Sequence, residues 1–522
     1  MNLRKRSGFM LKAAYYITTP IYYVNDKPHI GHAYTSLACD VMARFKRMEG
    51  ASVHFLTGTD EHGQKIEQSA LKRGMEPQSF TDEVSKSFRK LADIMNFSHD
   101  DFIRTTEERH KEGARALWTR LQDKGMIYKG SYEGWYAVSD EAFYNEDETQ
   151  LREDGKRYAL SSGKEVQWLT EPSYFFKLSA MQERLLEHYE RCSDFIMPDA
   201  RRNEVVSFVK SGLKDLSISR TSFRWGITVP ENEKHVMYVW LDALSNYMSA
   251  LGYPDEQSQL YRKFWPASIH VVGKDILRFH AVYWPAFLMA AELPLPKRVF
   301  AHGWWTNEGQ KISKSLGNVI DPFKLVESYG LDQVRYFLLR EVPFGKDGDF
   351  SVAALLQRVN SDLSNAYGNL AQRVLSMIHK NCMEKMPRPG PLQKIDQKLL
   401  SFSNETLLKT RDHMSSQAFH KALEAIWLLV SEANVYTDET APWALKKSDE
   451  ARMSTVLYVL ANIIRRVSLM AHPFMPESTQ RLLVMLGEGE GPYDFERFDD
   501  MIQTGISIIK PQAVFPRYVQ EI

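Results

Sequence analysis

The sequence has few cysteines, no long apolar run and no excess of charge of either sign. Only three cysteines occur in 522 residues, Cys39, Cys192 and Cys382, and they lie too far apart for paired zinc ligands or a disulfide framework. This pattern is typical of a protein from a reducing compartment. The longest apolar run, residues 281–291, has about half of the residues that a membrane-spanning helix needs. We therefore expect a cytoplasmic protein that does not enter a membrane, with a buried helix at residues 281–291.

The composition excludes several classes of protein. Lys and Arg number 66 and Asp and Glu number 66, so overall charge does not indicate a polyanionic partner, although it leaves a local basic patch open. Hydrophobic residues at 43% and charged residues at 25% exclude a disordered or collagen-like chain. The length suggests about three domains. Residues 1–14 form a basic leader, for which disorder, an upstream start and the remnant of an organelle signal all remain open.

The first patterned segment predicts a strand, a helix and a second strand. Residues 15–20 favour a strand that ends at Pro20, apolar residues then recur at helical spacing from about Gly31 until Gly50, and residues 53–57 favour another strand. This βαβ unit predicts a parallel sheet, in which ligands bind at the carboxyl ends of the strands. The string His-Ile-Gly-His at residues 29–32 falls at that end.

The rest of the chain predicts an interrupted α/β domain followed by helices. Residues 128–171, rich in Gly, Tyr and acidic residues, suggest an inserted and irregular β module, after which strands at 268–272 and 299–302 flank a helix at 276–291. Beyond about residue 350 the pattern is helical, with a break at 387–391. The fold class is therefore α/β, with a Rossmann-like parallel-sheet nucleotide-binding domain, an inserted module and an all-α helical bundle.

Two motifs indicate phosphate chemistry. His29 and His32 flank Gly31 at a strand-to-helix turn, where backbone N–H groups, the helix end and imidazole donors converge on one point. Lys311 and Lys314, in the string Lys-Ile-Ser-Lys-Ser, form a loop suited to neutralising a polyphosphate leaving group. Either string alone has an ordinary structural explanation. Both together, in this order on βα units, favour nucleotide chemistry.

The two motifs resemble the signature sequences of class I aminoacyl-tRNA synthetases, and other strings are similar to the methionyl-tRNA synthetases among them. These strings are Tyr-Tyr-Val-Asn at 22–25, Gly-Thr-Asp-Glu-His-Gly at 58–63, Tyr-Val-Trp-Leu-Asp-Ala-Leu-Ser-Asn-Tyr at 238–247, Gly-Lys-Asp-Ile at 273–276, Phe-His at 279–280 and Ala-Pro-Trp at 441–443. The resemblance extends from Tyr15 to about Phe474. One departure is conservative, because Ile312 stands where the family's commonest loop has Met.

The resemblance implies an enzyme that activates methionine with ATP and Mg²⁺ to methionyl-adenylate and transfers it to the 3′ end of tRNA. It implies that His29, His32, Lys311 and Lys314 are the catalytic residues. It places Gly31, Gly273, Asp275 and Lys314 at the ATP, with Gly31 under the adenine and Asp275 at the ribose.

The resemblance also implies a methionine pocket. Asp60 would bind the ammonium group, and the other pocket positions are Ile21, Tyr23, Trp240, Ala243, Leu244, Tyr247, Ile276 and His280. Contacts between sulfur and aromatic rings are favourable, by about 0.3 to 1.5 kcal/mol each. Without the resemblance, Trp240 and Tyr247 would be interpreted as core residues and Asp60 as a helix cap.

The inserted module departs from the family's better-known pattern. Many relatives carry a zinc knuckle with paired cysteines there, whereas this chain has Ala137 and Asp140 where the first pair would stand. We therefore expect no metal site and no structural zinc. The aromatic residues expected to hold the module are Tyr132, Trp135, Phe143 and Trp168.

The helical half suggests a tRNA contact. Residues 351–400 contain seven Lys or Arg against three acidic residues, which suits phosphate contacts. Asn365, Asn369 and Arg373 are spaced by four on one helix face, and by resemblance this face and Trp443 read the tRNA anticodon, because Asn and Arg can bind base edges and a Trp can stack on an unpaired base.

The expected domains are 15–124 and 226–350 for the two halves of the catalytic domain, 125–225 for the connective module, and 351–522 for the anticodon-binding domain. We expect a monomer without an obligate protein partner. Two alternatives remain: a nucleotidyltransferase of the same superfamily, which would not need the helical half, and a catalytically inactive relative that only binds tRNA, which would be free to lose His29, His32, Lys311 and Lys314.

Overall fold

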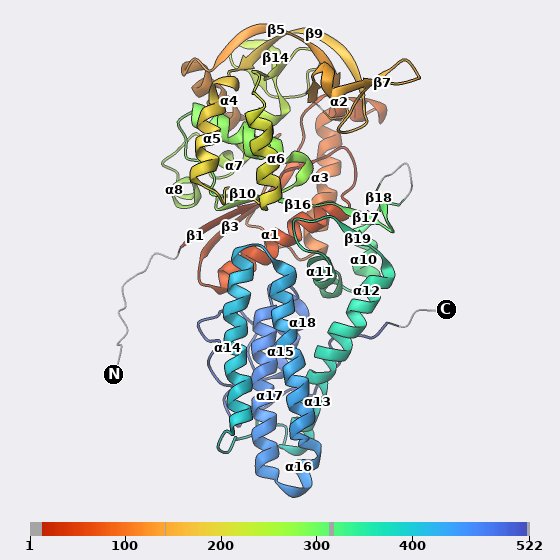
Figure 1. The fold of residues 1–522 in the computed structure, drawn as a ribbon, viewed down its shortest axis with the longest axis vertical. Helices are drawn as coiled ribbons and strands as arrows, with labels where there is room; N and C mark the ends of the chain where they lie inside the picture. The colour runs from red at the N-terminus through yellow and green to blue at the C-terminus, as the bar shows by residue number, and fades with distance from the viewer. Residues whose placement is uncertain (1–12, 141, 313–317, 519–522) are drawn as a thin grey trace. The chain divides into compact units, whose positions relative to one another are not determined.

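The computed structural model describes residues 13–140, 142–312 and 318–518 (Figure 1). The side chains of Tyr132, Ala142, Phe143, Glu171 and Lys311 lie outside this description, as does all of Lys314. The chain divides into two compact units. We call residues 14–39 and 53–302 the sheet unit, and residues 40–52 and 303–518 the helical unit.

A twisted parallel sheet forms the centre of the sheet unit. Its strands are β1 (Ala14–Thr18), β2 (Tyr22–Tyr23), β3 (Ser52–Asp60), β4 (Asp101–Arg104), β10 (Ile196–Met197), β15 (Ile269–Gly273) and β16 (Val299–His302). The strand order is β10-β16-β15-β1-β3-β2, and β4 pairs with β3. β15 is parallel to β1 and β16, and β3 is parallel to β2 and β4, so the predicted parallel sheet is confirmed.

Helices surround this sheet. They are α2 (Gln64–Lys72), α3 (Pro77–Ile94), α4 (Glu108–Asp123), α5 (Gln182–Arg191), α6 (Asp199–Lys210), α7 (Val239–Ser249), α8 (Gln259–Phe264) and α9 (Trp284–Ala290). Helix α1 (Ile30–Met48) begins within the His-Ile-Gly-His string, and Gly50 follows the helix with a positive φ of 81°, as predicted for its C-terminal cap. Every residue of α9 is buried, which confirms the buried helix predicted from the apolar run.

The inserted segment is a β module, as predicted, but it forms a regular antiparallel sheet, so the predicted irregularity is wrong. β5 (Ile127–Ala137) pairs with β9 (Glu165–Phe176) from Ile127↔Phe176 to Tyr136↔Gln167. The sheet also contains β6 (Ala142–Tyr144), β7 (Thr149–Leu151), β8 (Arg157–Ala159) and β11 (Leu216–Ser217), and a second small sheet contains β12 (Ser219–Arg220), β13 (Thr228–Val229) and β14 (Asn232–Met237). Gly and Pro residues lie inside these strands and are typical of loops, so the sequence pattern did not indicate the strand pairing.

Of the four aromatic residues expected to hold this insertion, the side chains of Trp135 and Trp168 are described, and they pack against each other. The rings of Trp135 and Trp168 meet edge to face with centroids 5.3 Å apart, and the Arg157 guanidinium lies over the Trp135 ring. Asp140 accepts hydrogen bonds from the hydroxyls of Tyr144 and Ser162. Among the described residues, no group of three or more His, Cys, Asp or Glu side chains is placed to hold a metal ion.

The helical unit contains three short strands and a bundle of helices. Its elements are β17 (Trp305–Asn307), β18 (Gln310–Lys311), β19 (Gly348–Phe350), α10 (Pro322–Tyr329), α11 (Leu331–Arg340), α12 (Val352–Arg358), a π-helical segment (Val359–Gly368), α13 (Asn369–Asn381), α14 (Lys394–Ser415), α15 (Phe419–Thr440), α16 (Pro442–Ser448), α17 (Glu450–Ala471) and α18 (Pro476–Met485). The predicted break at 387–391 falls between α13 and α14. Of the described helices, α17 alone is long and apolar enough to cross a membrane, but 94% of its apolar window is buried in the protein, which is typical of a core helix.

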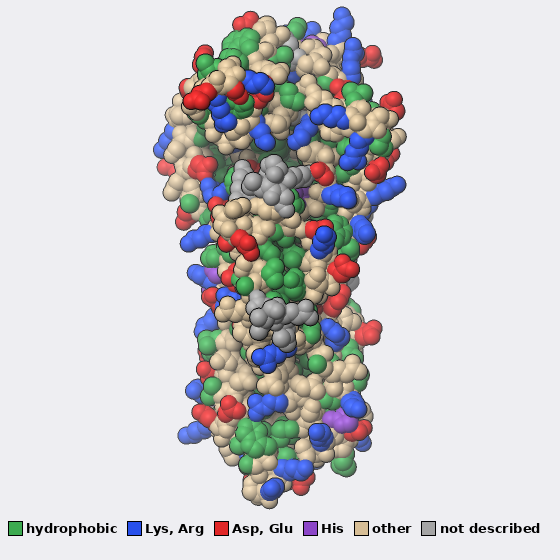
Figure 2. Space-filling view, turned by 90° about the vertical axis from the view of Figure 1, so that its right-hand side faces the viewer, with side chains coloured by type: hydrophobic (Ala, Val, Ile, Leu, Met, Phe, Trp, Pro, Cys, Tyr) green, Lys and Arg blue, Asp and Glu red, His purple; other side chains and the backbone are tan. Residues whose placement is uncertain are grey.

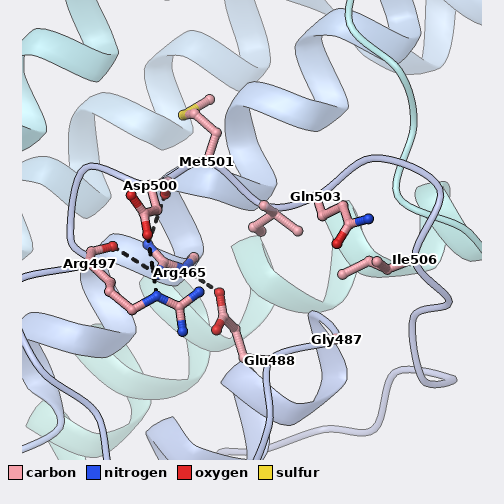
Figure 3. A pocket seen from close by; sticks show the side chains of 9 residues that line it. Arg465, Gly487, Glu488, Arg497, Asp500, Met501, Gln503 and Ile506 are labelled. Carbon is pink, nitrogen blue, oxygen red and sulfur yellow. Dashed lines mark hydrogen bonds and ion pairs between the residues drawn. The ribbon is translucent and has the colours of Figure 1, made fainter.

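The helical C-terminal domain is confirmed as far as Met485, but the last described segment, residues 486–518, contains no helix, so the helical pattern expected beyond about residue 350 does not extend to it. Arg465 of α17 anchors the segment by donating to the Glu488 carboxylate and to the backbone carbonyls of Arg497, Phe498 and Asp500 (Figure 3). A cavity of about 370 Å³ lies beside this guanidinium. Gly487, which follows α18 with a φ of 87°, turns the chain out of the helix.

A buried ion pair lies in the core of the helical unit. The Arg335 guanidinium of α11 and the Asp40 carboxylate of α1 are both fully buried and 2.7 Å apart. Arg335 also donates to the backbone carbonyls of Pro473 and Phe474, and Arg44 donates to Asp40. The pair is thus supported by further hydrogen bonds, the condition under which a buried ion pair offsets its cost of desolvation.

Candidate active site

The two histidines of the first motif lie together at the start of α1. The Nδ1 atom of His29 accepts a hydrogen bond from the backbone N–H of Gly31, and the Nδ1 atom of His32 accepts one from the backbone N–H of His29. A neutral imidazole carries one proton, so both rings carry it on Nε2. The ring centroids are 3.9 Å apart. The turn therefore offers two neighbouring N–H donors and no cation.

Burial determines the charge of this histidine pair. It lowers the pKa of His29, against the opposing effect of the Asp275 carboxylate. It lowers the pKa of His32 well below its usual value, and His29 adds to that effect. Both imidazoles are therefore neutral at pH 7 and act as hydrogen-bond donors, a form suited to stabilising charge that moves during a reaction.

Two glycines leave room for the neighbouring polar side chains. A Cβ on Gly31 would lie 2.9 Å from the imidazole of His29, and one on Gly273 would lie 2.5 Å from a carboxylate oxygen of Asp275. Alanine at either position would therefore displace the side chain beside it. The Asp275 carboxylate also raises the pKa of both His29 and His280, so this charge acts on both parts of the site.

Asp60 is the last residue of β3 and is 7% exposed. Tyr23 of β2 is its partner in the sheet, and the Asp60 carbonyl accepts a hydrogen bond from the backbone N–H of Val24. The predicted position of Asp60 at the carboxyl end of a strand is confirmed. A buried carboxylate at this edge is suited to binding a cation that enters without its water.

Helix α7 and the segment after β15 bring the predicted aromatic residues together. The Tyr247 hydroxyl lies 2.7 Å from Nε2 of His280, and Nδ1 of His280 donates to the carbonyl of Ile276. Because Nδ1 of His280 carries the proton, its Nε2 accepts a hydrogen bond from the Tyr247 hydroxyl. The Trp240 ring stacks on Phe279 with centroids 3.6 Å apart, and its Nε1 is buried without a hydrogen-bond partner among the described residues. These groups form an apolar wall in which hydrogen bonds orient the Tyr247 hydroxyl and the His280 ring.

Of the remaining predicted pocket residues, Ala243 and Leu244 lie on α7, Ile276 follows β15, and Ile21 lies between β1 and β2. Ala243 and Leu244 are buried on α7, and Ile21 and Ile276 are half-buried. His280 lies in a π-helical segment, Phe279–Tyr283, which the sequence did not predict. Such segments are rare and often occur at functional sites.

The state of His280 gives a testable pH dependence. Burial lowers its pKa from 6.5 to about 4. Below pH 6.5 the unfolded chain binds a proton that the folded protein does not, so the free energy of unfolding falls as the pH falls, by up to about 3 kcal/mol at pH 4. We expect the melting temperature of His280→Gln to fall less than that of the unsubstituted protein between pH 6.5 and 4. Parallel pH profiles would contradict this.

A second group of predicted residues lies in the helical unit. Asn365 and Asn369 are exposed, Arg373 is half-buried, and the Trp443 side chain is 47% exposed. The Arg373 guanidinium lies over the Trp443 ring, 5.3 Å from its centroid. Asn365 lies in the π-helical segment and Asn369 begins α13, so the three residues are not spaced along one regular α-helix.

A strained turn precedes Trp443. Ala441, between α15 and α16, has the left-handed φ of 42° and ψ of 60°, which L-residues with a side chain seldom adopt. α16 lies at the end of the bundle (Figure 1), and hydrophobic side chains gather near this end of the face drawn in Figure 2. On that face acidic and basic side chains are interspersed, in agreement with the zero net charge.

Comparison with known proteins assigns the chain to a family. A family model described as class I tRNA synthetases (M) matches residues 15–375, and one for the anticodon-binding domain of methionyl tRNA ligase matches residues 386–521. The methionine–tRNA ligase of Rickettsia felis is 57% identical over 517 residues, 98% of this chain and 100% of that one, and the ligase of Brucella suis is 56% identical over 98% and 99%. The chain belongs to the methionyl-tRNA synthetase family.

A solved structure of the family supports the same conclusion for the fold. Mycobacterium tuberculosis methionyl-tRNA synthetase in complex with methionyl-adenylate is 50% identical and superimposes with a TM-score of 0.95, covering 97% of this chain and 100% of that one. The methionyl-tRNA synthetase match to residues 15–375 contains every predicted nucleotide and pocket residue and also Asn365, Asn369 and Arg373, whereas Trp443 lies in the anticodon-binding match. Phe279, which stacks on Trp240, was not among the predicted pocket residues, although it belongs to the string Phe-His at 279–280.

Proposed function

We propose that this methionyl-tRNA synthetase activates methionine with ATP and transfers the methionyl group to the 3′ end of its tRNA. A carboxylate oxygen of methionine attacks the α-phosphorus of ATP, and the bond to pyrophosphate breaks, which leaves methionyl-adenylate. The tRNA ribose then displaces AMP from that intermediate. The observation that carries this proposal is the pair of neutral N–H donors at the start of α1 in a chain 50% identical to a solved enzyme that holds methionyl-adenylate.

The residue roles at the nucleotide follow from the donors present. His29 and His32 donate from Nε2 to the triphosphate as its charge shifts to the leaving group, and Mg²⁺ accompanies ATP as part of the substrate. Gly31 lies under the adenine, and Asp275, with Gly273 beside it, binds the ribose. Lys311 and Lys314 act on the pyrophosphate, a role that rests on the motif alone because the side chain of Lys311 and the whole of Lys314 lie outside the described residues.

The methionine pocket combines one buried charge with an apolar wall. Asp60 binds the ammonium group, and Tyr247 and His280 face the thioether. The wall is formed by Ile21, Tyr23, Trp240, Ala243, Leu244 and Ile276. A purely apolar pocket separates ligands that differ by one methylene by only about 1–3 kcal/mol, so the fixed polar pair contributes to the selectivity.

The direct test is ATP–pyrophosphate exchange without tRNA, with each of the twenty amino acids in turn. Exchange with methionine alone supports the proposal. Exchange with another amino acid contradicts the pocket assignment, and no exchange at all would favour the relative that only binds tRNA.

We propose the anticodon as the ligand of Asn365, Asn369, Arg373 and Trp443. An exposed Trp and two exposed amides suit unpaired bases. Trp443→Ala should leave amino-acid-dependent exchange unchanged and raise the KM for tRNA about 10-fold or more, because a base–aromatic stack is lost. Aminoacylation and exchange measured on the same preparation test this, with Trp168→Ala as a control at an exposed Trp of the sheet unit. Equal losses in both reactions would mean that Trp443 is structural.

We further propose that the enzyme acts as a monomer in the cytoplasm, where methionine, ATP and tRNA are all present, and that residues 125–225 are a connective module without zinc. A molar mass near 60.4 kDa by light scattering would support the monomer. Metal analysis of the purified protein tests the second statement.

A further inference from the structure

Asp242 lies within α7 and binds two imidazoles. Its Oδ2 is 2.7 Å from Nδ1 of His62, and its Oδ1 is 2.7 Å from Nε2 of His110. The Asp242 side chain is only 1% exposed. Because an ionised carboxylate can only accept hydrogen bonds, each facing imidazole nitrogen donates. Burial raises the pKa of Asp242, but the two histidines outweigh it and lower the pKa to about 2, so the group is ionised at neutral pH.

The three residues connect three elements of the sheet unit. Asp242 belongs to α7, His110 to α4, and His62 to the segment that follows β3. Helix α4 packs closely on α7, since a Cβ on Gly113 would lie 2.6 Å from Cβ of Ser249, and Nδ1 of His110 lies 3.1 Å from the Ser249 hydroxyl. α4 therefore contacts α7 at Asp242, through His110, and at Ser249.

Both ends of this network adjoin the proposed methionine pocket. Asp242 directly precedes Ala243 and lies two residues after Trp240, whereas His62 lies two residues after Asp60. The hydrogen bond between Asp242 and His62 thus links the strand end that carries the ammonium ligand to the helix that carries the apolar wall.

A second set of contacts holds the same strand end. Glu61 is fully buried and accepts two hydrogen bonds from Arg104, at 2.7 and 2.9 Å, and one from the Thr106 hydroxyl. The Trp225 indole donates to the Glu61 carbonyl. The segment that follows Asp60 is therefore fixed at Glu61 by Arg104 and at His62 by Asp242.

We propose that Asp242 is a positioning residue, which acts through His62 and His110 to set the distance between Asp60 and the wall of α7. This rests on the proposed function, because it presumes that Asp60 binds the ammonium group. With the ammonium group fixed at one end and the thioether at the other, that distance selects amino acids by side-chain length. Asp242 would thus control discrimination between methionine and ethionine, which is one methylene longer.

Asp242→Asn is the variant that tests this. An asparagine removes the negative charge and accepts a hydrogen bond from one imidazole only. Its NH₂ group faces the N–H of the other imidazole, so either that link is lost or that ring must move its proton to its other nitrogen. We expect the KM for methionine in ATP–pyrophosphate exchange to rise about 10-fold or more, with the KM for ATP changed less than about twofold. The ratio of kcat/KM for methionine to that for ethionine should fall about 10-fold, since one methylene is worth about 10- to 200-fold in a fitted pocket.

His62 offers a graded second test if Asp242→Asn does not fold. His62→Gln keeps a side-chain donor for Asp242 and His62→Leu removes it, so His62→Leu should show the larger rise in the KM for methionine and His62→Gln a partial rescue. His188→Gln is a matched control, because His188 is also a buried histidine of the sheet unit, 7% exposed against 4% for His62, but lies on α5, outside the pocket. It should leave both KM values unchanged.

The outcomes separate this inference from the proposed function. Suppose that the unsubstituted enzyme exchanges with methionine. The inference alone would then be overturned if a folded Asp242→Asn or His62→Leu variant kept both the KM for methionine and the ratio of kcat/KM for methionine to that for ethionine. Equal rises in the KM values for methionine and ATP would show that the network is only structural and would also overturn it. No methionine-dependent exchange by the unsubstituted enzyme would overturn both.

Discussion

Asp60→Ala is expected to raise the KM for methionine about 100-fold or more, because truncating one partner of a buried, hydrogen-bonded charge pair costs about 2–5 kcal/mol. The Asp60 carboxylate ends β3 in a buried position, where little water competes for an ammonium group. The neighbouring acid cannot replace it, because Glu61 is held in a two-bonded ion pair with Arg104. The methionine dependence of ATP–pyrophosphate exchange measures the effect.

Asp60→Asn separates the charge from the shape. It keeps the size and one acceptor oxygen, so a loss close to that of alanine would show that the negative charge is the essential property. The KM for ATP should stay within about twofold in both variants, because the histidine pair at the start of α1 is unchanged. Methionine kinetics unaffected by Asp60→Ala would exclude the residue as the ammonium ligand.

Asp40→Ala is expected to lower the free energy of unfolding of the helical unit by about 3–5 kcal/mol, since it leaves the fully buried Arg335 guanidinium without its carboxylate. Burial lowers the pKa of Arg335 and the Asp40 carboxylate opposes this, so removal of Asp40 leaves an unfavourable charge in the core. In thermal and urea denaturation, Asp40→Ala should unfold at a lower temperature and a lower urea concentration than the unsubstituted protein. Arg335→Met should have a smaller effect, because Asp40 keeps its hydrogen bond from Arg44.

The double variant Asp40→Ala with Arg335→Met distinguishes the pair from its packing. If an uncompensated charge causes the loss, removing both partners should restore much of the free energy of unfolding that the single variants lost. Additive losses in the double variant would contradict the argument. Arg411→Met is a suitable control, because its ion pair with Glu49 in the same unit is partly exposed and contributes about 1 kcal/mol or less.

The sequence predicted those features that depend on neighbours in the chain. The turn at residues 29–32, the start of α1 and the place of Asp60 at a strand end all follow from local patterns, and the structure confirms them. The motifs also identified the family without any long-range information. The roles of the individual site residues remain predictions for the kinetic tests.

Features that depend on distant contacts were not predicted. Asp242 lies 180 residues from His62 and 132 from His110, and Asp40 lies 295 residues from Arg335, so no local spacing indicates these pairs. The pairing of β5 with β9 was missed for a different reason. Pro172 and Gly130 and Gly134 lie inside these strands and are typical of loops, but cross-strand pairing outweighs that preference.

The contact between Arg373 and Trp443 limits what the tryptophan can hold. The guanidinium already covers one face of the indole, so that face is occupied before any ligand arrives. A base can then stack only on the opposite face, and the ring can receive one nucleotide instead of intercalating between two. In the free protein the same cation also shields an exposed aromatic surface, which reduces the tendency of this end of the bundle to self-associate.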